Sequence, residues 1–364
     1  GLGGMSRAYH DAFRKHLICP KYVKTPRPLL INNWEATYFD FTLEKLKAIV
    51  DAVAGTGIDT FVLDDGWFGK RDDDHSGLGD WVPNTGKLDL SAIIDYTHSK
   101  GLKFGLWFEP EMVCEDSDLF RAHPDYAIGR ADRGRCYARH QFMLDLTRAE
   151  VREAIAGAVN RILDTYPIEY VKWDYNRNVT DSYSAELPPE RQAEFAHRYA
   201  LGLYDLCERI VSAHPDIFFE GCASGGARFD PAMLYYFPQI WTSDNTDAED
   251  RTFIQWGTSM VYPPSVMSCH VSVCPNHQTG RTASFDTRAD IAHLGATGYE
   301  LDTSAWTEED KAAVRAQTAA YREMQDLVLD GDFWRVGDIR DNVFAFLMTD
   351  KNKSRAHMVC YRRL

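Results

Sequence analysis

Acidic side chains at the ends of apolar segments are the residues of this sequence best suited to chemistry. The clearest case is residues 170–177, which begin as an apolar strand and turn polar within a few positions. Lys172 and Asp174 lie two residues apart, so on a strand they share one face. A neighbouring cation favours the ionised form of a carboxyl group, and an ionised carboxylate can act as a nucleophile. A purely structural salt bridge at a strand end is the alternative interpretation.

The same pattern recurs along the chain. Polar or aromatic residues close six predicted strands: Asn33 and Trp34; Asp64 and Asp65; Trp107 and Glu109; Lys172 and Asp174; Glu220 and Cys222; and Asp244. Carboxylates gathered in a core cost free energy unless they have a function. Asp174 and Asp244 belong to different strands, and two carboxyl groups facing each other across a sugar ring are what glycoside hydrolysis requires. Since no early strand carries a His-x-His metal signature, paired-carboxylate chemistry without a metal or cofactor is favoured over metal-dependent hydrolysis.

The segments that must position these residues alternate between strand and helix. The predicted strands are 29–35, 60–67, 103–110, 168–174, 217–222, 239–244, 265–270 and 297–301. The predicted helices are 43–53, 91–100, 150–165, 189–213 and 308–329, the last with Thr307 as its N-cap. A ninth strand candidate, 142–146, is the weakest and is assigned to a loop.

Eight strands with helical crossovers predict a (β/α)8 TIM barrel, whose active site lies at the C-terminal ends of the strands. A doubly wound open sheet is the alternative, but the sequence lacks the Gly-rich phosphate turn that such a fold would carry after an early strand. We therefore expect three parts: residues 1–28 as a lead-in, 29–330 as the barrel, and 331–364 as the truncated start of an antiparallel β-domain. The start, Gly-Leu-Gly-Gly-Met, suggests a fragment of a longer protein.

Bulk composition narrows the partners. The 364 residues carry a net charge of −14, which disfavours nucleic acid and anionic membranes because both require a basic patch. No apolar run reaches membrane-spanning length. The eight cysteines are scattered without a Cys-x-x-Cys pair, which indicates reduced thiols in a cytoplasmic protein.

Six stretches carry a resemblance to a known family. The strings LLINNWEATYFDF, FVLDDGWFG, FGLWFEPEMV, VKWDYNRN, CASGGARFD and WTSDNTDA resemble the α-galactosidases of glycoside hydrolase family 36, in the same order over nearly the whole chain. The resemblance implies a retaining enzyme that removes terminal α-linked galactose from galactosides such as melibiose and raffinose. It also implies an N-terminal β-sandwich that this sequence lacks, and a full-length protein that forms a homo-oligomer.

The resemblance further implies roles for individual residues. Asp174 matches the nucleophile and Asp244 the general acid/base. Asp64 and Asp65 would bind the 4- and 6-hydroxyls of galactose, Lys172 would bind a neighbouring hydroxyl, Cys222 and Gly225 would lie near the 2-hydroxyl, and Trp34, Trp107 and Arg139 would complete the pocket.

Several alternatives stay open at this point. The enzyme could be an α-N-acetylgalactosaminidase or a raffinose-synthase-like galactosyl transferase, and the fragment could be an inactive sugar-binding remnant. Asp247 competes with Asp244 for the acid role, or else lies at the start of a helix. Residues 72–74 are interpreted as a solvated acidic loop, and His270 as a buried, hydrogen-bonded histidine.

Overall fold

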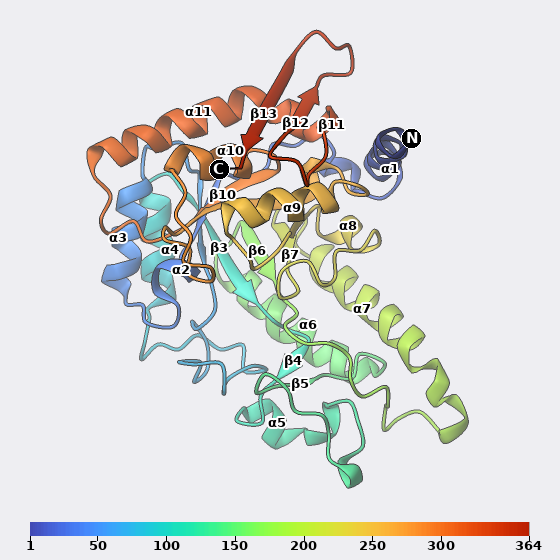
Figure 1. Cartoon of the computed structure of the whole chain (residues 1–364). Coiled ribbons are helices and arrows are strands. Elements are labelled where there is room, and N and C mark those ends of the chain that lie inside the picture. The colour runs from blue at the N-terminus through green and yellow to red at the C-terminus, as the bar shows by residue number, and fades with distance from the viewer. Residues whose placement is uncertain (364) are drawn as a thin grey trace.

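The computed structural model describes residues 1–363, and its centre is a closed barrel of eight parallel strands (Figure 1). In order around the barrel these are β1 (Leu30–Asn32), β10 (Ala296–Glu300), β9 (Met267–Ser272), β8 (Gln239–Trp241), β7 (Phe218–Gly221), β6 (Tyr170–Trp173), β3 (Lys103–Phe108) and β2 (Thr60–Leu63). Each predicted barrel strand is present, which confirms the TIM barrel. All residues of β2, β6 and β10 are buried, as expected for parallel strands that are covered on both faces.

Helices surround the barrel on its outside. The longer ones after the first strand are α3 (Leu43–Val53), α4 (Leu90–Ser99), α6 (Ala149–Thr165), α7 (Phe195–Val211), α9 (Ala248–Thr258), α10 (Phe285–Ala292) and α11 (Glu308–Asp330). Thr307 caps α11 as predicted, because its side chain accepts from the Asp310 backbone N–H while Asp310 accepts in return.

The predicted helix 189–213 is the main boundary error. Residues Pro189–Glu194 form a 3-10 segment instead, and the α-helix begins at Phe195. Two consecutive prolines, Pro188 and Pro189, explain the difference, since Pro lacks a backbone N–H and restricts the residue before it. Helix α1 (Leu2–His16) was not predicted, because its few apolar residues are interrupted by polar ones.

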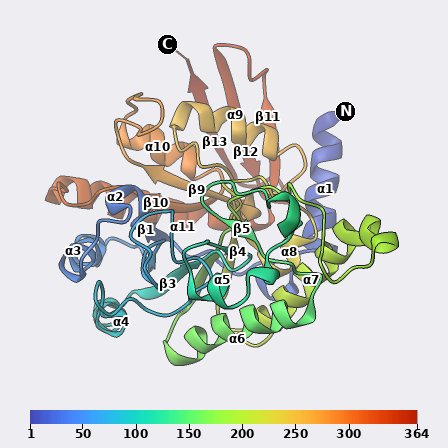
Figure 2. The same ribbon diagram turned by 90° about the horizontal axis from the view of Figure 1, so that it is seen from below.

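A small excursion covers the C-terminal end of the barrel. β4 (Met112–Val113) and β5 (Phe142–Met143) pair antiparallel outside the barrel, with the short helix α5 (Asp118–Ala122) between them in sequence. Seen from below, this excursion lies in front of the barrel strands (Figure 2). Its position confirms that segment 142–146 is a loop strand and not a ninth barrel strand.

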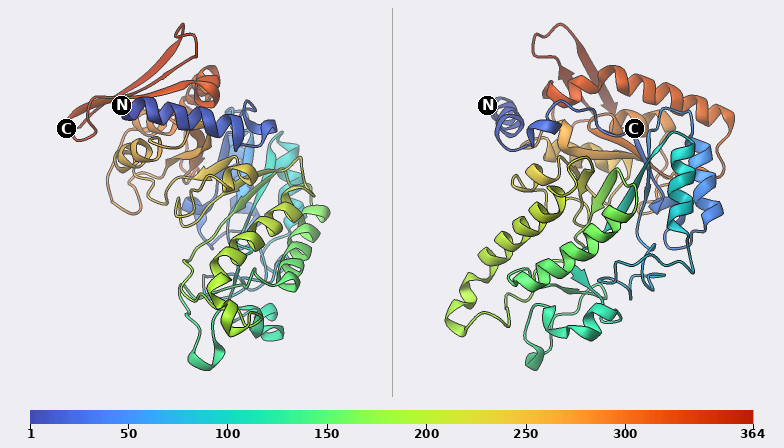
Figure 3. Two further views of the ribbon diagram at one scale, coloured as in Figure 1. Left: turned by 90° about the vertical axis from the view of Figure 1, so that its right-hand side faces the viewer. Right: turned by 180° about the vertical axis from the view of Figure 1, so that it is seen from behind.

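The C-terminal residues form a three-stranded antiparallel sheet of β11 (Asp332–Val336), β12 (Val343–Thr349) and β13 (Ala356–Arg362). Figure 3 shows this sheet with α1 at the opposite end of the molecule from α5. One face is buried against the barrel helices, where Phe346 packs edge-on to Trp256 and joins a second apolar cluster. The opposite face leaves Met358 59% exposed. Among residues 1–363, no helix is long and apolar enough to cross a membrane.

Two helical glycines give a matched test of this packing. A Cβ on Gly202, inside α7, would lie 1.9 Å from the Leu146 carbonyl oxygen, whereas one on Gly157, inside α6, has open space. Ala gains roughly 0.5–1 kcal/mol over Gly in a helix interior, but overpacking costs about 1–3 kcal/mol. We expect Gly202→Ala to lower the free energy of unfolding in urea and Gly157→Ala to raise it. Equal effects of the two substitutions would contradict this close approach of α7 to Leu146.

Candidate active site

A cavity of about 210 Å³ opens at the C-terminal ends of the barrel strands. Its lining residues are Trp34, Glu35, Phe39, Asp64, Asp65, Arg71, Asp74, Trp107, Glu109, Arg139, Lys172, Asp174, Asn176, Cys222, Trp241, Asp244, Thr246, His277, Gln278 and Glu300. All but one of the residues predicted to act on substrate are therefore brought to one cavity from strands and loops far apart in the sequence.

The exception is Gly225, which packs against the backbone that carries Asp244. A Cβ at this position would lie 2.7 Å from the Asp244 backbone nitrogen, and the residue has a φ of +82°. Both the close approach and the left-handed conformation require glycine. Gly225 thereby lets the loop after β7, which begins with the lining residue Cys222, approach the loop after β8. Its expected position near the 2-hydroxyl of galactose stays a prediction.

Asp174 follows directly after β6 and is held by neutral donors. Its Oδ2 accepts from Trp107 Nε1 at 3.2 Å and from Asn176 Nδ2 at 2.7 Å, and its Oδ1 accepts from the Tyr175 backbone N–H at 2.8 Å. Three N–H donors fix the orientation of both oxygens. The side chain is buried at the base of the cavity yet open to it.

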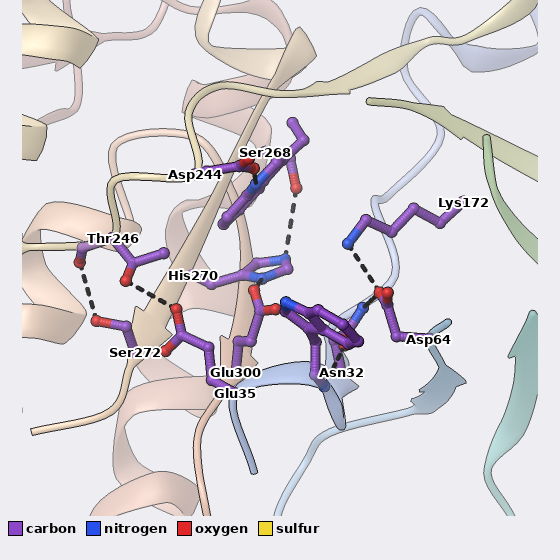
Figure 4. A network of polar contacts seen from close by, with 12 residues as sticks. Asn32, Glu35, Asp64, Lys172, Asp244, Thr246, Ser268, His270, Ser272 and Glu300 are labelled. Atoms are coloured by element: carbon purple, nitrogen blue, oxygen red, sulfur yellow. Dashed lines mark hydrogen bonds and ion pairs between the residues drawn. The ribbon is translucent and has the colours of Figure 1, made fainter. Parts of the chain in front are cut away.

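The expected pairing of Lys172 with Asp174 is wrong. Lys172 Nζ instead lies 2.8 Å from Asp64 Oδ2, which also accepts from Asn32 (Figure 4). Lys172 and Asp174 both line the cavity, as their two-residue spacing predicts, but the Lys172 ammonium group binds Asp64 instead. Burial alone would lower the pKa of Lys172, but the carboxylates of Asp64 and Glu300 outweigh burial and raise that pKa well above its usual value.

Asp65 has a cation of its own. Arg71 binds it through two nitrogens, with Nη2 at 2.8 Å from Oδ2 and Nε at 3.0 Å from Oδ1, and both side chains are buried. Burial raises the pKa of Asp65, and Arg71 only partly opposes that shift. The adjacent carboxyl groups of Asp64 and Asp65 are thus each matched by a different buried cation.

Asp244, three residues beyond β8, differs from Asp174 in its surroundings. Trp241 Nε1 donates to Asp244 Oδ1 at 3.0 Å, and the carboxyl group stays accessible through the cavity mouth. Desolvation by the surrounding protein and the negative charge of Asp174 raise its pKa. A carboxyl group whose pKa is raised in this way can hold a proton for donation.

Asp247 has a structural task. It is the N-cap of α9, where its side chain accepts from the backbone N–H groups of Glu249 and Asp250, and it also pairs with Arg281. Burial alone would raise the pKa of Asp247, but these hydrogen bonds and the Arg281 charge hold it below its usual value. These contacts favour the helix-start interpretation over the acid role.

Arg139 and Glu109 meet at Asn176. Arg139 Nη1 donates to Asn176 Oδ1 at 3.1 Å and to Ser224 Oγ at 2.9 Å. Glu109 accepts from the Asn176 backbone N–H at 2.6 Å and from its Nδ2 at 3.0 Å. Because Asn176 also donates to Asp174, this one amide links three cavity residues. Burial and the Asp174 charge raise the pKa of Glu109 to about 8.

A second acidic group, which was not predicted from the sequence, lies on the side of Asp244 and is formed by Glu35 and Glu300 (Figure 4). Glu35 accepts from Thr246 Oγ1 at 2.8 Å, and Glu300 lies 3.0 Å from His270 Nδ1. Burial and the Glu300 charge raise the pKa of Glu35 to about 8. Burial alone would also raise the pKa of Glu300, but His270 and Lys172 hold it below its usual value.

Glu300 could have been identified from the sequence, because it is the last residue of a barrel strand, like the residues that were found. Arg71 and His277 sit in irregular loops, where no periodic pattern indicates direction. Across residues 1–363, one set of His and carboxylate side chains lies close enough together to hold a metal ion. It consists of Asp74, His75 and His140, at the mouth of the cavity.

Comparison with known proteins gives a consistent result. A family model described as melibiase matches residues 1–331. The chain is 48% identical to α-galactosidase Mel36A of Lactobacillus acidophilus, over 98% of this chain and 49% of that protein. It is also 48% identical to α-galactosidase AgaA of Geobacillus stearothermophilus, over 100% of this chain and 50% of that protein.

Solved structures agree with these matches. The crystal structure of the GH36 α-galactosidase AgaA superposes with a TM-score of 0.98 and covers 100% of this chain and 51% of that one. A variant of AgaA in complex with raffinose superposes with a TM-score of 0.97 over the same shares of both chains, at 48% identity. The chain spans about half the length of the curated relatives it matches.

The Arg71–Asp65 pair gives a test of the site's electrostatics. Arg71→Met would leave a buried carboxyl group without its cation, which we expect to cost about 3 kcal/mol of unfolding free energy at neutral pH. The loss should shrink as pH falls, because a protonated Asp65 needs no counter-charge. Urea unfolding followed by fluorescence measures both effects.

Lys45→Met is the matched control. Lys45 and Asp40 form a pair of the same length, 2.8 Å, but the two side chains are 47% and 88% exposed. An exposed pair contributes less than about 1 kcal/mol. Equal losses in the two variants would show that burial of the Arg71–Asp65 pair has no energetic consequence.

Proposed function

Because this chain belongs to the melibiase family within glycoside hydrolase family 36, we propose that it forms the catalytic part of a retaining α-galactosidase. Its substrates would be galactosides with a terminal α-linked galactose, such as melibiose and raffinose. The observation that carries the proposal is the difference between the two aspartates on one cavity: Asp174 is oriented by three N–H donors, whereas the pKa of Asp244 is raised.

The reaction proceeds by two displacements at the anomeric carbon. In the first, an Asp174 oxygen forms a bond to that carbon while the glycosidic bond breaks, and Asp244 donates its proton to the departing oxygen. In the second, Asp244 removes a proton from water, whose oxygen displaces Asp174 and releases galactose. Two inversions give net retention of configuration.

The charge of Asp174 helps Asp244 to change roles. Before the first step, the Asp174 charge contributes to the raised pKa of Asp244, so that Asp244 holds a proton. In the galactosyl-enzyme, Asp174 is a neutral ester and that contribution is gone. The pKa of Asp244 then falls, which suits a group that has just given up its proton and must next act as a base.

Galactose binding would use the remaining cavity residues. Asp64 and Asp65 would accept hydrogen bonds from the 4- and 6-hydroxyls, and Lys172 would donate to a neighbouring one. Trp34, Trp107 and Arg139 would wall the site, with Cys222 and Gly225 near the 2-hydroxyl.

The loop that follows Cys222 has little freedom to retreat from the sugar. It packs so closely on the next loop that a Cβ on Gly225 would lie only 2.7 Å from the Asp244 backbone nitrogen. This restriction favours galactose over its bulkier N-acetylated analogue.

Three broader features remain proposals. Residues 29–330 would form the catalytic barrel and 331–364 the start of a C-terminal β-domain. The full-length protein would form a homo-oligomer. It would act on oligosaccharides, in line with the raffinose and stachyose bound by variants of AgaA. A cytoplasmic location is supported by the eight cysteines, all of which are free thiols.

Nitrophenol release tests the proposed activity. We expect the protein to hydrolyse 4-nitrophenyl α-galactoside and to leave the α-N-acetylgalactosaminide nearly untouched, because Cys222 and its loop close the wall at the 2-position. Preference for the N-acetylated substrate would replace the proposed activity with that of an α-N-acetylgalactosaminidase. Binding of galactose without hydrolysis of either substrate would indicate a sugar-binding remnant.

Substitution of the two aspartates by alanine should affect turnover in different ways. Asp174→Ala should abolish turnover of every galactoside, since no covalent intermediate can form. Asp244→Ala should lower kcat/KM by about 10²–10⁴-fold for poor leaving groups and much less for nitrophenol, which needs no proton. Azide should partly restore Asp244→Ala and yield the α-galactosyl azide by a second inversion at the galactosyl-enzyme, detected by NMR.

The pH profile adds an independent readout. Asp244 must be protonated for the first step, so wild-type kcat/KM should fall as pH rises through its raised pKa. With nitrophenol as the leaving group, this alkaline decrease should be absent in Asp244→Ala. The assignment is wrong if Asp247→Ala reproduces the azide rescue, or if Asp174→Ala yields the α-azide.

A further inference from the structure

We propose that Asp74, His75 and His140 form a binding site for a zinc-class metal ion at the mouth of the cavity, and that a bound ion restrains the turn carrying Arg139. None of the three residues is among those assigned to catalysis or substrate binding above, and metal binding can be tested whether or not the proposed activity holds. One oxygen of Asp74 and one nitrogen from each histidine all lie within 4.8 Å of one another.

The three side chains lie close together. The rings of His75 and His140 have centroids 3.7 Å apart, and His75 Nε2 lies 3.4 Å from Asp74 Oδ1. Two partly exposed imidazoles in such close contact beside a carboxylate need only small side-chain rotations to point at a common centre. Because their ring nitrogens are accessible, an ion could enter from solvent.

The ligands come from two different loops. Asp74 and His75 lie between β2 and α4, and His140 lies between β4 and β5. An ion bound to all three would therefore join two segments that meet at the cavity mouth. A metal bridge between two loops reduces the conformational freedom of both, as a disulfide bridge does.

Both loops are held from the cavity side. Arg71, which binds Asp65, also donates to the Ser76 carbonyl next to His75 at 3.0 Å. On the other loop, Arg139 and His140 have φ values of 53° and 57°, and Arg139 is tied to Asn176 and Ser224. Consecutive non-glycine residues in the left-handed region are unfavourable unless the surroundings hold them. These contacts fix the backbone that presents His75 and His140.

The ligand set selects the type of ion. Two imidazoles and one carboxylate suit Zn²⁺, Co²⁺, Ni²⁺ or Cu²⁺, whereas Mg²⁺ and Ca²⁺ prefer all-oxygen sites. Three protein ligands leave one tetrahedral position open. Here that position would be available to water or to a group at the cavity rim, since Asp74 itself lines the cavity.

A metal ion bound at this site should affect the entry of substrate more than the bond-breaking steps. His140 follows Arg139 directly, so an ion on His140 limits the movement of the Arg139 side chain at the mouth. Asp174 and Asp244 lie deeper and keep their own hydrogen-bond partners. We therefore expect bound Zn²⁺ to raise KM for the galactoside while kcat changes little.

Calorimetric titration of the metal-free protein with Zn²⁺ tests the site without reference to activity. We expect one ion per chain, with binding weakened by at least about 10–100-fold in His75→Ala and in His140→Asn. Asn is chosen at position 140 because it tolerates the left-handed backbone. His197→Ala removes an exposed histidine on α7 and should bind Zn²⁺ like the wild type.

Two further measurements complete the test. Mg²⁺ should give no comparable heat, and the Zn²⁺-induced rise in KM should be reversed by EDTA and absent in His75→Ala. Zn²⁺ binding of unchanged strength in both histidine variants would overturn the proposal, because it would place the ion elsewhere, for example on the exposed thiols of Cys274 and Cys360. Failure of the wild type to bind Zn²⁺ would overturn it as well.

Discussion

An excess of carboxyl groups over cations at the mouth of the barrel is the constraint on which the site depends. Eight lining residues are acidic, whereas three are Lys or Arg. In surroundings of low dielectric constant, that many negative charges cannot coexist without compensation. The structure meets the constraint in two ways: it pairs some carboxylates with buried cations, and it raises the pKa of others, such as Glu35 and Glu109, so that they retain protons.

The barrel itself explains why so much of the site could be predicted from the sequence. In a closed parallel barrel every strand ends at the same face, so any polar residue that closes an apolar strand is carried to one place. Asp64 and Asp65 were found by this rule alone. Glu300 obeys the same rule at the end of β10 and could have been found with it.

The rest of the site depends on contacts that have no period in the sequence. Arg71 and His277 lie in irregular loops, and their direction is set by tertiary partners such as Asp65 and Glu35. The partner of Lys172 was mistaken for a related reason, because its contact with Asp64 joins residues 108 positions apart and has no local pattern. Helix α9 was also not predicted, although a position at the start of a helix was one of the two interpretations given for its N-cap, Asp247.

The distribution of hydrogen-bond and ion-pair partners also fits the roles proposed for the individual carboxyl groups. Asp64 and Asp65 bind cations, so their charge is already compensated and suits them to hold hydroxyl groups in place. Asp174 and Asp244 are bound by neutral N–H donors, which orient an oxygen without providing a full compensating charge. In the proposed mechanism, the charge of Asp174 can therefore still act on Asp244 and on the anomeric carbon of the substrate. Exchanging these environments would leave every carboxyl group in place, yet it would remove the difference on which the proposed roles of nucleophile and acid depend.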